Sequence, residues 1–105
     1  MRVQIRGQNL KVSNAVREHV ERRLEFALGR FDRAIQSVSV RVSDLNGPRG
    51  GDDKSCQVIV NGQAGWTVVI EERQGAELAA VDLAAERAGR SVARQLDRVK
   101  DARAA

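Results

Sequence analysis

The stretch IQSVSVRVSDLNGPRGGDDKSCQVIVNGQAGWTVVIEER, residues 35–73, decides the fold of this chain. Over 35–44, Val38, Val40 and Val42 alternate with polar side chains, which is typical of a strand with one apolar and one wet face. Turn residues fill 46–53, and further strands are predicted at about 54–60 and about 65–73. Asn61-Gly62 between these two strands predicts a tight hairpin turn. The stretch therefore predicts a sheet with a single apolar face, with Cys56 on the core side.

The flanking segments add one strand and two amphipathic helices. Val3 and Ile5 alternate with polar residues, and apolar residues recur at helical spacing over about 14–30, behind Ser13 as a helix N-cap. A second apolar stripe marks a helix over about 75–100: Leu78, Val81, Ala85, Ala88, Val92, Leu96 and Val99. The order β-α-β-β-β-α predicts an α+β fold. We expect a two-layer sandwich whose four-stranded sheet carries both helices on one face, like a double-stranded-RNA-binding domain.

Length and composition predict a single globular domain. The 105 residues fit one binding domain over 1–105, with 101–105 as a short C-terminal tail. No apolar run approaches the ~20 residues of a membrane span, and the N-terminus lacks the apolar segment of a secretory signal. The single cysteine, Cys56, cannot form an internal disulfide. We therefore expect a cytoplasmic protein without a membrane partner.

The basic residues are mostly arginine, 15 of 18, and the formal net charge is +4. On the second predicted helix, four of them lie three and four residues apart on one face, opposite the apolar stripe: Arg87, Arg90, Arg94 and Arg98. On the first, basic residues gather along one flank: His19, Arg22, Arg23 and Arg30. Guanidinium groups donate paired hydrogen bonds to phosphate. The pattern favours recognition of a polyanion, although a merely solvated surface is the alternative.

Aromatic residues are few, which favours recognition of RNA shape and backbone over base stacking. The chain has two Phe, one Trp and no Tyr. Phe31 and Trp66 fit core positions, whereas Phe26 lies on the basic flank of the first helix. Sequence-specific stacking is therefore not expected.

Signals for catalysis or metal binding are weak. His19 is the only histidine, Cys56 is the only cysteine, and no cluster has the spacing of metal ligands. Asp53-Lys54-Ser55 lacks the glycine that precedes the lysine of a phosphate-binding loop. Asp44, Asp52 and Asp53 have the chemistry to touch a divalent cation, but a solvated acidic loop is the simpler interpretation. We predict no catalytic residue, no metal, no cofactor and no small-molecule substrate.

Two segments resemble the short ribosome hibernation promoting factors and the related ribosome-associated inhibitor, protein Y. These segments are Leu10–Val20 and the run Ala80-Val81-Asp82-Leu83 with the arginines that follow it. The resemblance covers nearly the whole chain. It implies binding in the tRNA and mRNA channel of the small ribosomal subunit, where such proteins contact ribosomal RNA and block translation by idle ribosomes. It also implies that the RNA-binding residues are Arg22, Arg23, Arg30, Arg87, Arg90, Arg94 and Arg98.

The chain departs from this family at three places. Ala76-Glu77-Leu78 stands where the family often has an acid-Met-Tyr triplet. The loop 46–53 is longer than in compact members, and its Arg49 is a possible additional contact. We expect no dedicated dimerisation domain after Lys100, which favours the short hibernation promoter.

Three alternatives remain open on the sequence alone. The first is a generic binder of structured or double-stranded RNA without ribosomal specificity. The second is a protein-interaction module that uses the wet face of the sheet: Ser37, Ser39, Arg41, Thr67 and Val69. The third is an enzyme that uses His19 and Cys56.

Overall fold

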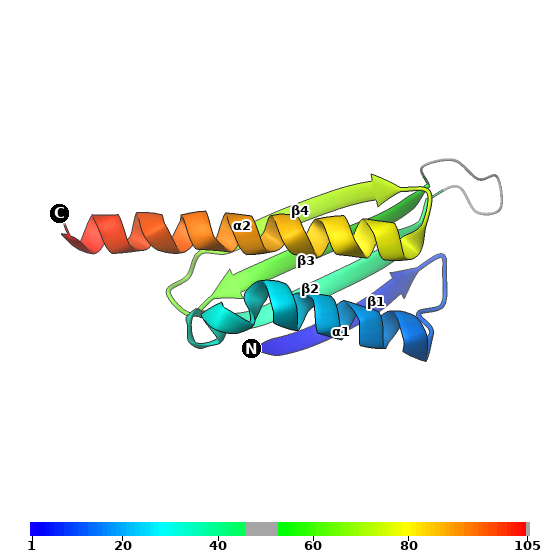
Figure 1. Cartoon of the computed structure of the whole chain (residues 1–105), viewed down its shortest axis with the longest axis horizontal. Helices are drawn as coiled ribbons and strands as arrows, with labels where there is room; N and C mark the ends of the chain where they lie inside the picture. Colours follow the sequence, from blue (N-terminus) through cyan, green and yellow to red (C-terminus); the bar gives the residue numbers. More distant parts are fainter. Residues whose placement is uncertain (46–52, 105) are drawn as a thin grey trace.

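The computed structural model describes residues 1–45 and 53–104, with side chains described up to residue 101. The elements follow the predicted order: β1 (Arg2–Gln8), α1 (Asn14–Leu28), a 3-10 helix η1 (Gly29–Ala34), β2 (Ile35–Asp44), β3 (Lys54–Gly62), β4 (Thr67–Gln74) and α2 (Glu77–Ala104). The strands lie in the order β1-β2-β3-β4. β1 is parallel to β2, and the other two pairs are antiparallel. Both helices cover the same face of this mixed sheet (Figure 1), so the predicted α+β architecture is confirmed.

The core lies between the sheet and the helices. Alternation along β2 turns Val38, Val40 and Val42 inward, each at most 2% exposed. Cys56 on β3 joins them and is fully buried. Phe31 and Trp66, both predicted as core residues, are partly buried and pack against this cluster. The period-two pattern therefore identified the inner face of the sheet correctly.

The first helix starts as predicted and ends earlier. The hydroxyl of Ser13 accepts a hydrogen bond from the backbone amide of Val16 at 3.1 Å, which caps the first turn. The α-helix ends at Leu28, shortly before the predicted end at about residue 30, and the chain continues to Ala34 as a 3-10 helix. The N-terminal amine pairs with Asp32 at 3.0 Å, which ties the start of β1 to this 3-10 helix.

The prediction of a hairpin turn at Asn61-Gly62 is wrong, because both residues belong to β3. The Asn61 side chain donates to Ser37 and accepts from Thr67, both at 3.2 Å, so it bridges three strands. The turn lies instead at residues 63–65, where Gly65 takes a left-handed φ of 89°. The Gly62 amide donates to the Trp66 carbonyl at 2.8 Å and closes that turn.

The second helix is longer than predicted and faces the core differently. It continues to Ala104, so the segment 101–104, expected as a tail, is helical. Leu78, predicted to be a core residue, is 44% exposed, whereas Ala80 and Ala84 are fully buried. The reason is geometric: at 100° per residue, Leu78 lies at the edge of the face centred on Ala84 and Ala88. Small side chains on that face let α2 pack closely on the sheet.

No helix within the described part of the chain is long and apolar enough to cross a membrane.

Candidate nucleic-acid interface

A groove separates the outer surfaces of the two helices, and its floor is made by two small residues. Gly89 of α2 lies against Ala27 of α1: a Cβ on Gly89 would come 2.9 Å from the carbonyl oxygen of Ala27 and 3.3 Å from its Cβ. Because neither residue fills the space above this contact, a groove of about 300 Å³ opens between the helices. Larger side chains form its walls: Arg23, Phe26, Arg30, Glu86 and Arg90.

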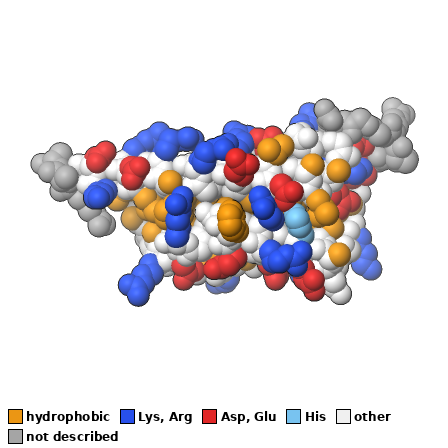
Figure 2. All heavy atoms as spheres, viewed as in Figure 1, with side chains coloured by type: hydrophobic (Ala, Val, Ile, Leu, Met, Phe, Trp, Pro, Cys, Tyr) orange, Lys and Arg blue, Asp and Glu red, His pale blue; other side chains and the backbone are white. Residues whose placement is uncertain are grey.

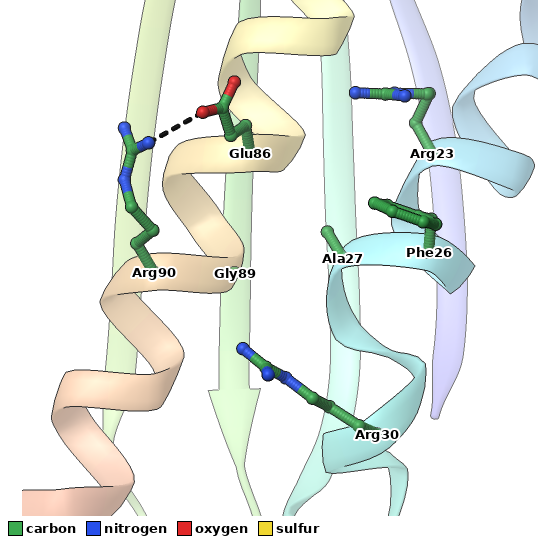
Figure 3. A pocket seen from close by; sticks show the side chains of 7 residues that line it. All are labelled: Arg23, Phe26, Ala27, Arg30, Glu86, Gly89 and Arg90. Carbon is green, nitrogen blue, oxygen red and sulfur yellow. Dashed lines mark hydrogen bonds and ion pairs between the residues drawn. The ribbon is translucent and has the colours of Figure 1, made fainter.

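One wall of the groove carries an exposed aromatic ring. Phe26 is 83% exposed. In Figure 3 its ring lies between Arg23 and Arg30, and Arg90 lies across the groove on α2. The guanidinium carbon of Arg23 is 5.8 Å from the centre of the ring, within the range of a cation–π contact. The groove therefore combines one flat apolar surface with three positive side chains.

A shared carboxylate ties the two helices together at one end of the groove. Asp82 of α2 lies 2.6 Å from Nε2 of His19 and 3.3 Å from Nε of Arg23, both on α1. Arg23 is thus held toward α2 and is 38% exposed. The single histidine has a structural partner on the neighbouring helix, and its position stabilises the packing of α1 on α2.

The remaining arginines differ in how strongly they are neutralised. Arg22 and Arg90 each pair with a glutamate four residues earlier on their own helix, at 4.0 Å to Glu18 and 2.7 Å to Glu86. Arg87 pairs with Glu72 of β4 and also donates to the backbone carbonyl of Glu71 at 3.2 Å.

Three arginines keep an unneutralised charge. Arg30 lies over the ring of Phe31 at 4.5 Å, and Arg94 donates to the hydroxyl of Ser91 at 3.2 Å. Within the described residues, neither of these nor Arg98 has a carboxylate at ion-pair distance. The surface formed by α1 and α2 therefore carries free positive charge beside exposed ion pairs.

Comparison with known proteins places the chain in a family. A sequence profile described as sigma 54 modulation protein / S30EA ribosomal protein matches residues 3–100. The chain belongs to this family, that of the ribosome hibernation promotion factors and protein Y.

Individual relatives agree with this assignment. The chain is 30% identical over 103 residues to a ribosome hibernation promotion factor of Picosynechococcus sp., a match that covers 96% of this chain and 50% of that protein. The chain therefore spans about half the length of this curated relative. The crystal structure of the N-terminal domain of Thermus thermophilus protein Y superposes with a TM-score of 0.74 at 27% identity, over 90% of this chain and 98% of that one.

A second solved structure supports the fold alone. The structure of a ribosomal subunit interface protein from Coxiella burnetii superposes with a TM-score of 0.78 at 21% identity, over 92% of this chain and 99% of that one. The α+β architecture of this family is therefore shared at low sequence identity.

In this member of the family, the seven arginines predicted to bind RNA lie in three separate places. Arg23, Arg30 and Arg90 meet at the groove. Three more follow α2, where Figure 2 shows Lys and Arg side chains along the outer edge of the helix, and all three are exposed: Arg87, Arg94 and Arg98. Arg22 lies outside the groove and pairs with Glu18 on the exposed surface of α1. Arg49 lies outside the described residues.

Sequence reasoning missed the floor of the groove and its link to Asp82. One signal was available: Gly89 interrupts an alanine-rich helix, where a glycine costs about 1 kcal/mol relative to alanine and therefore indicates a close packing contact. Phe26 was assigned to the basic flank, but its place between two arginines depends on how α1 ends. No signal in the sequence pairs Asp82 with residues of α1.

The alternative sites are less favourable in the structure. Burial raises the pKa of the Cys56 thiol to about 12, so this thiol stays protonated near neutral pH, which disfavours the nucleophilic thiolate. Asp44 and Asp53 both pair with Lys54, at 3.1 Å and 3.6 Å. Among the described residues no group of three possible metal ligands occurs. On the wet face of the sheet, Val69 is 57% exposed, but the hydroxyls of Ser37 and Thr67 are bonded to Asn61.

Proposed function

We propose that this protein is a ribosome hibernation factor that binds the small ribosomal subunit in its tRNA and mRNA channel and blocks translation by idle ribosomes. Its partner is ribosomal RNA in the cytoplasm. The proposal extends what is known of its family to this chain. The observation that carries it is the surface of α1 and α2, where seven arginines are exposed or half-exposed and three of them have no described carboxylate partner.

Phosphate groups are the chemical targets of this surface. Each arginine that replaces a counterion at a phosphate adds binding free energy that falls as salt rises. Exposed ion pairs such as Arg90–Glu86 contribute at most about 1 kcal/mol, so a phosphate can replace the glutamate at little cost. We assign phosphate contacts to seven arginines: Arg22, Arg23, Arg30, Arg87, Arg90, Arg94 and Arg98.

Removal of the unpaired arginines tests the proposal. In the double variant Arg94→Ala with Arg98→Ala, we expect weaker co-sedimentation with small subunits and a salt slope reduced by about 2, one unit for each lost phosphate contact. The matched control is Arg41→Ala with Arg73→Ala, which removes two exposed arginines from the opposite face of the sheet. Equal binding by wild type and the helix variant, or a larger loss in the control, would show that the surface is wrong.

Two further measurements separate ribosomal specificity from general RNA binding. Excess unrelated duplex RNA should leave the complex with small subunits intact, whereas a generic binder of double-stranded RNA would be released. Chemical probing of the small subunit should show protection of decoding-centre RNA. Protection elsewhere on the subunit would contradict the proposed place of binding while leaving RNA binding intact.

A further inference from the structure

We propose that the groove between α1 and α2 binds one unpaired nucleotide of RNA, whose base stacks on Phe26 while the adjacent phosphates contact Arg23, Arg30 and Arg90. This inference rests on the proposed function, since it names the RNA element that the α1–α2 surface takes. The inference adds stacking of one base on Phe26 to the phosphate contacts of the proposed function.

The first argument is the exposure of Phe26. The chain has three aromatic residues, and the other two, Phe31 and Trp66, pack against the core. Phe26 is 83% exposed and makes no contribution to that core. Its only described ring contact is with Arg23, a residue that Asp82 already holds in place. The ring is therefore presented to solvent beside a groove and has no described packing role there.

The second argument is the shape of the space beside the ring. Figure 3 shows the ring nearly edge-on, with Arg23 beyond one face and Arg30 beyond the other. The groove of about 300 Å³ is at the small end of the range for ligand pockets, which suits a single base better than a helix or a strand. Gly89 and Ala27 keep the floor low, so a flat ring can enter beside Phe26.

The third argument is charge. The groove walls carry three arginines and one glutamate, Glu86, a balance of 3 − 1 = +2, and Asp82, which pairs with Arg23 without lining the groove, leaves a local balance of 2 − 1 = +1. A nucleotide has the complementary composition, because its base is flat and weakly polar while the phosphates on either side of it are anionic. A paired base in an A-form helix offers no free face to a side chain, so the occupant has to be unpaired, in a bulge, a loop or a single strand. Stacking of this kind tolerates any base, because every base has a flat face.

Substitution of Phe26 separates stacking from charge. The probe is an RNA hairpin with one unpaired 2-aminopurine, compared with the same hairpin fully paired. Stacking on an aromatic side chain is worth about 1–3 kcal/mol, so Phe26→Ala should weaken binding of the bulged hairpin about 5- to 150-fold. It should leave the paired hairpin within about twofold, and the salt slope should stay unchanged because no phosphate contact is lost. Phe26→Trp should retain tight binding, and wild type should quench the 2-aminopurine fluorescence.

Control variants keep the result interpretable. Phe26→Leu retains an apolar side chain without an aromatic face, so it should behave like Phe26→Ala. Because Phe26 is exposed, all three variants should unfold at nearly the wild-type temperature. An equal loss for bulged and paired hairpins, or no loss with Phe26→Ala, overturns the inference. Phe26-dependent binding to subunits that survives ribonuclease digestion would also overturn it, because the occupant would then be a protein.

The same variants distinguish failure here from failure of the proposed function. If wild type and Phe26→Ala bind small subunits equally well, the stacking site is wrong and the ribosomal function stands. If wild type does not bind small subunits but still binds the bulged hairpin through Phe26, the nucleotide site in the groove is supported and the proposed ribosomal function is wrong.

Discussion

Two helical glycines offer a test of how closely the helices approach. Gly89→Ala and Gly29→Ala make the same chemical change, and an alanine normally stabilises a helix relative to glycine by about 1 kcal/mol. At Gly89 the new methyl would lie 2.9 Å from the backbone oxygen of Ala27, which cannot move without separating α1 from α2. At Gly29, with φ −56° and ψ −36°, the three atoms nearest to the new methyl all belong to the flexible side chain of Glu25. The two substitutions should therefore have opposite signs.

The magnitudes follow from these contacts. Extra methyl groups in tightly packed sites cost about 1–3 kcal/mol, which exceeds the gain in helix propensity, so Gly89→Ala should destabilise the protein by about 1 kcal/mol. Gly29→Ala should stabilise it by about 0.4–1 kcal/mol, since the native backbone already suits alanine. Each kcal/mol shifts the Tm of a domain of this size by about 4–8 °C, which thermal unfolding followed by circular dichroism resolves. A Tm for Gly89→Ala at or above that of Gly29→Ala would refute the close contact at the floor of the groove.

Three further predictions concern single side chains. Ser13→Ala removes the cap of α1 and should cost about 1 kcal/mol in the free energy of unfolding, measured by urea titration. Asp82→Asn should lower the Tm slightly while tightening RNA binding at low salt, since it weakens the link between helices and frees Arg23 for phosphate; weaker binding would contradict this. The Cys56 thiol, with its pKa raised to about 12, stays protonated in the fold while the unfolded thiol ionises near pH 9, so stability should fall between pH 9 and 12, at most by about 1.4 kcal/mol per unit. Cys56→Ala should remove that part of the pH dependence, and iodoacetamide should label wild type only on unfolding.

The fold was largely predictable because its signals are local. The alternation of Val38, Val40 and Val42 defines a strand regardless of what lies beside it, and β2 begins and ends where predicted. The hairpin turn was misplaced for the opposite reason. Asn61 is a good turn former in isolation, but its hydrogen bonds to Ser37 and Thr67 hold it in the ladder, and these partners are 24 and 6 residues away.

The candidate site was only partly predictable, because it depends on how two helices lie against each other. Helical spacing places Arg23 and Arg30 on one flank of the first helix, but nothing local says that this flank faces Arg90. The same ambiguity explains why the apolar stripe wrongly placed Leu78 in the core. In the structure α2 packs on the sheet through buried alanines such as Ala80 and Ala84, and Leu78 is exposed. Contacts such as His19–Asp82, 63 residues apart, become visible only once both helices are placed.

The ion pairs on α1 and α2 also rank the arginines as phosphate ligands. Arg87 is the most firmly held, because Glu72 is only 20% exposed and the backbone of Glu71 accepts a second hydrogen bond from the same guanidinium. Exchange of this pair for a phosphate would leave a partly buried carboxylate uncompensated, which is costly. Arg90 pairs with Glu86, which is 55% exposed and keeps its hydration when the arginine leaves. Arg30 and the pair Arg94 and Arg98 give up no described carboxylate. The binding energy for RNA should therefore come mainly from the groove and from the last turns of α2, and Arg87 should contribute least of the seven phosphate contacts because it also fixes α2 on β4.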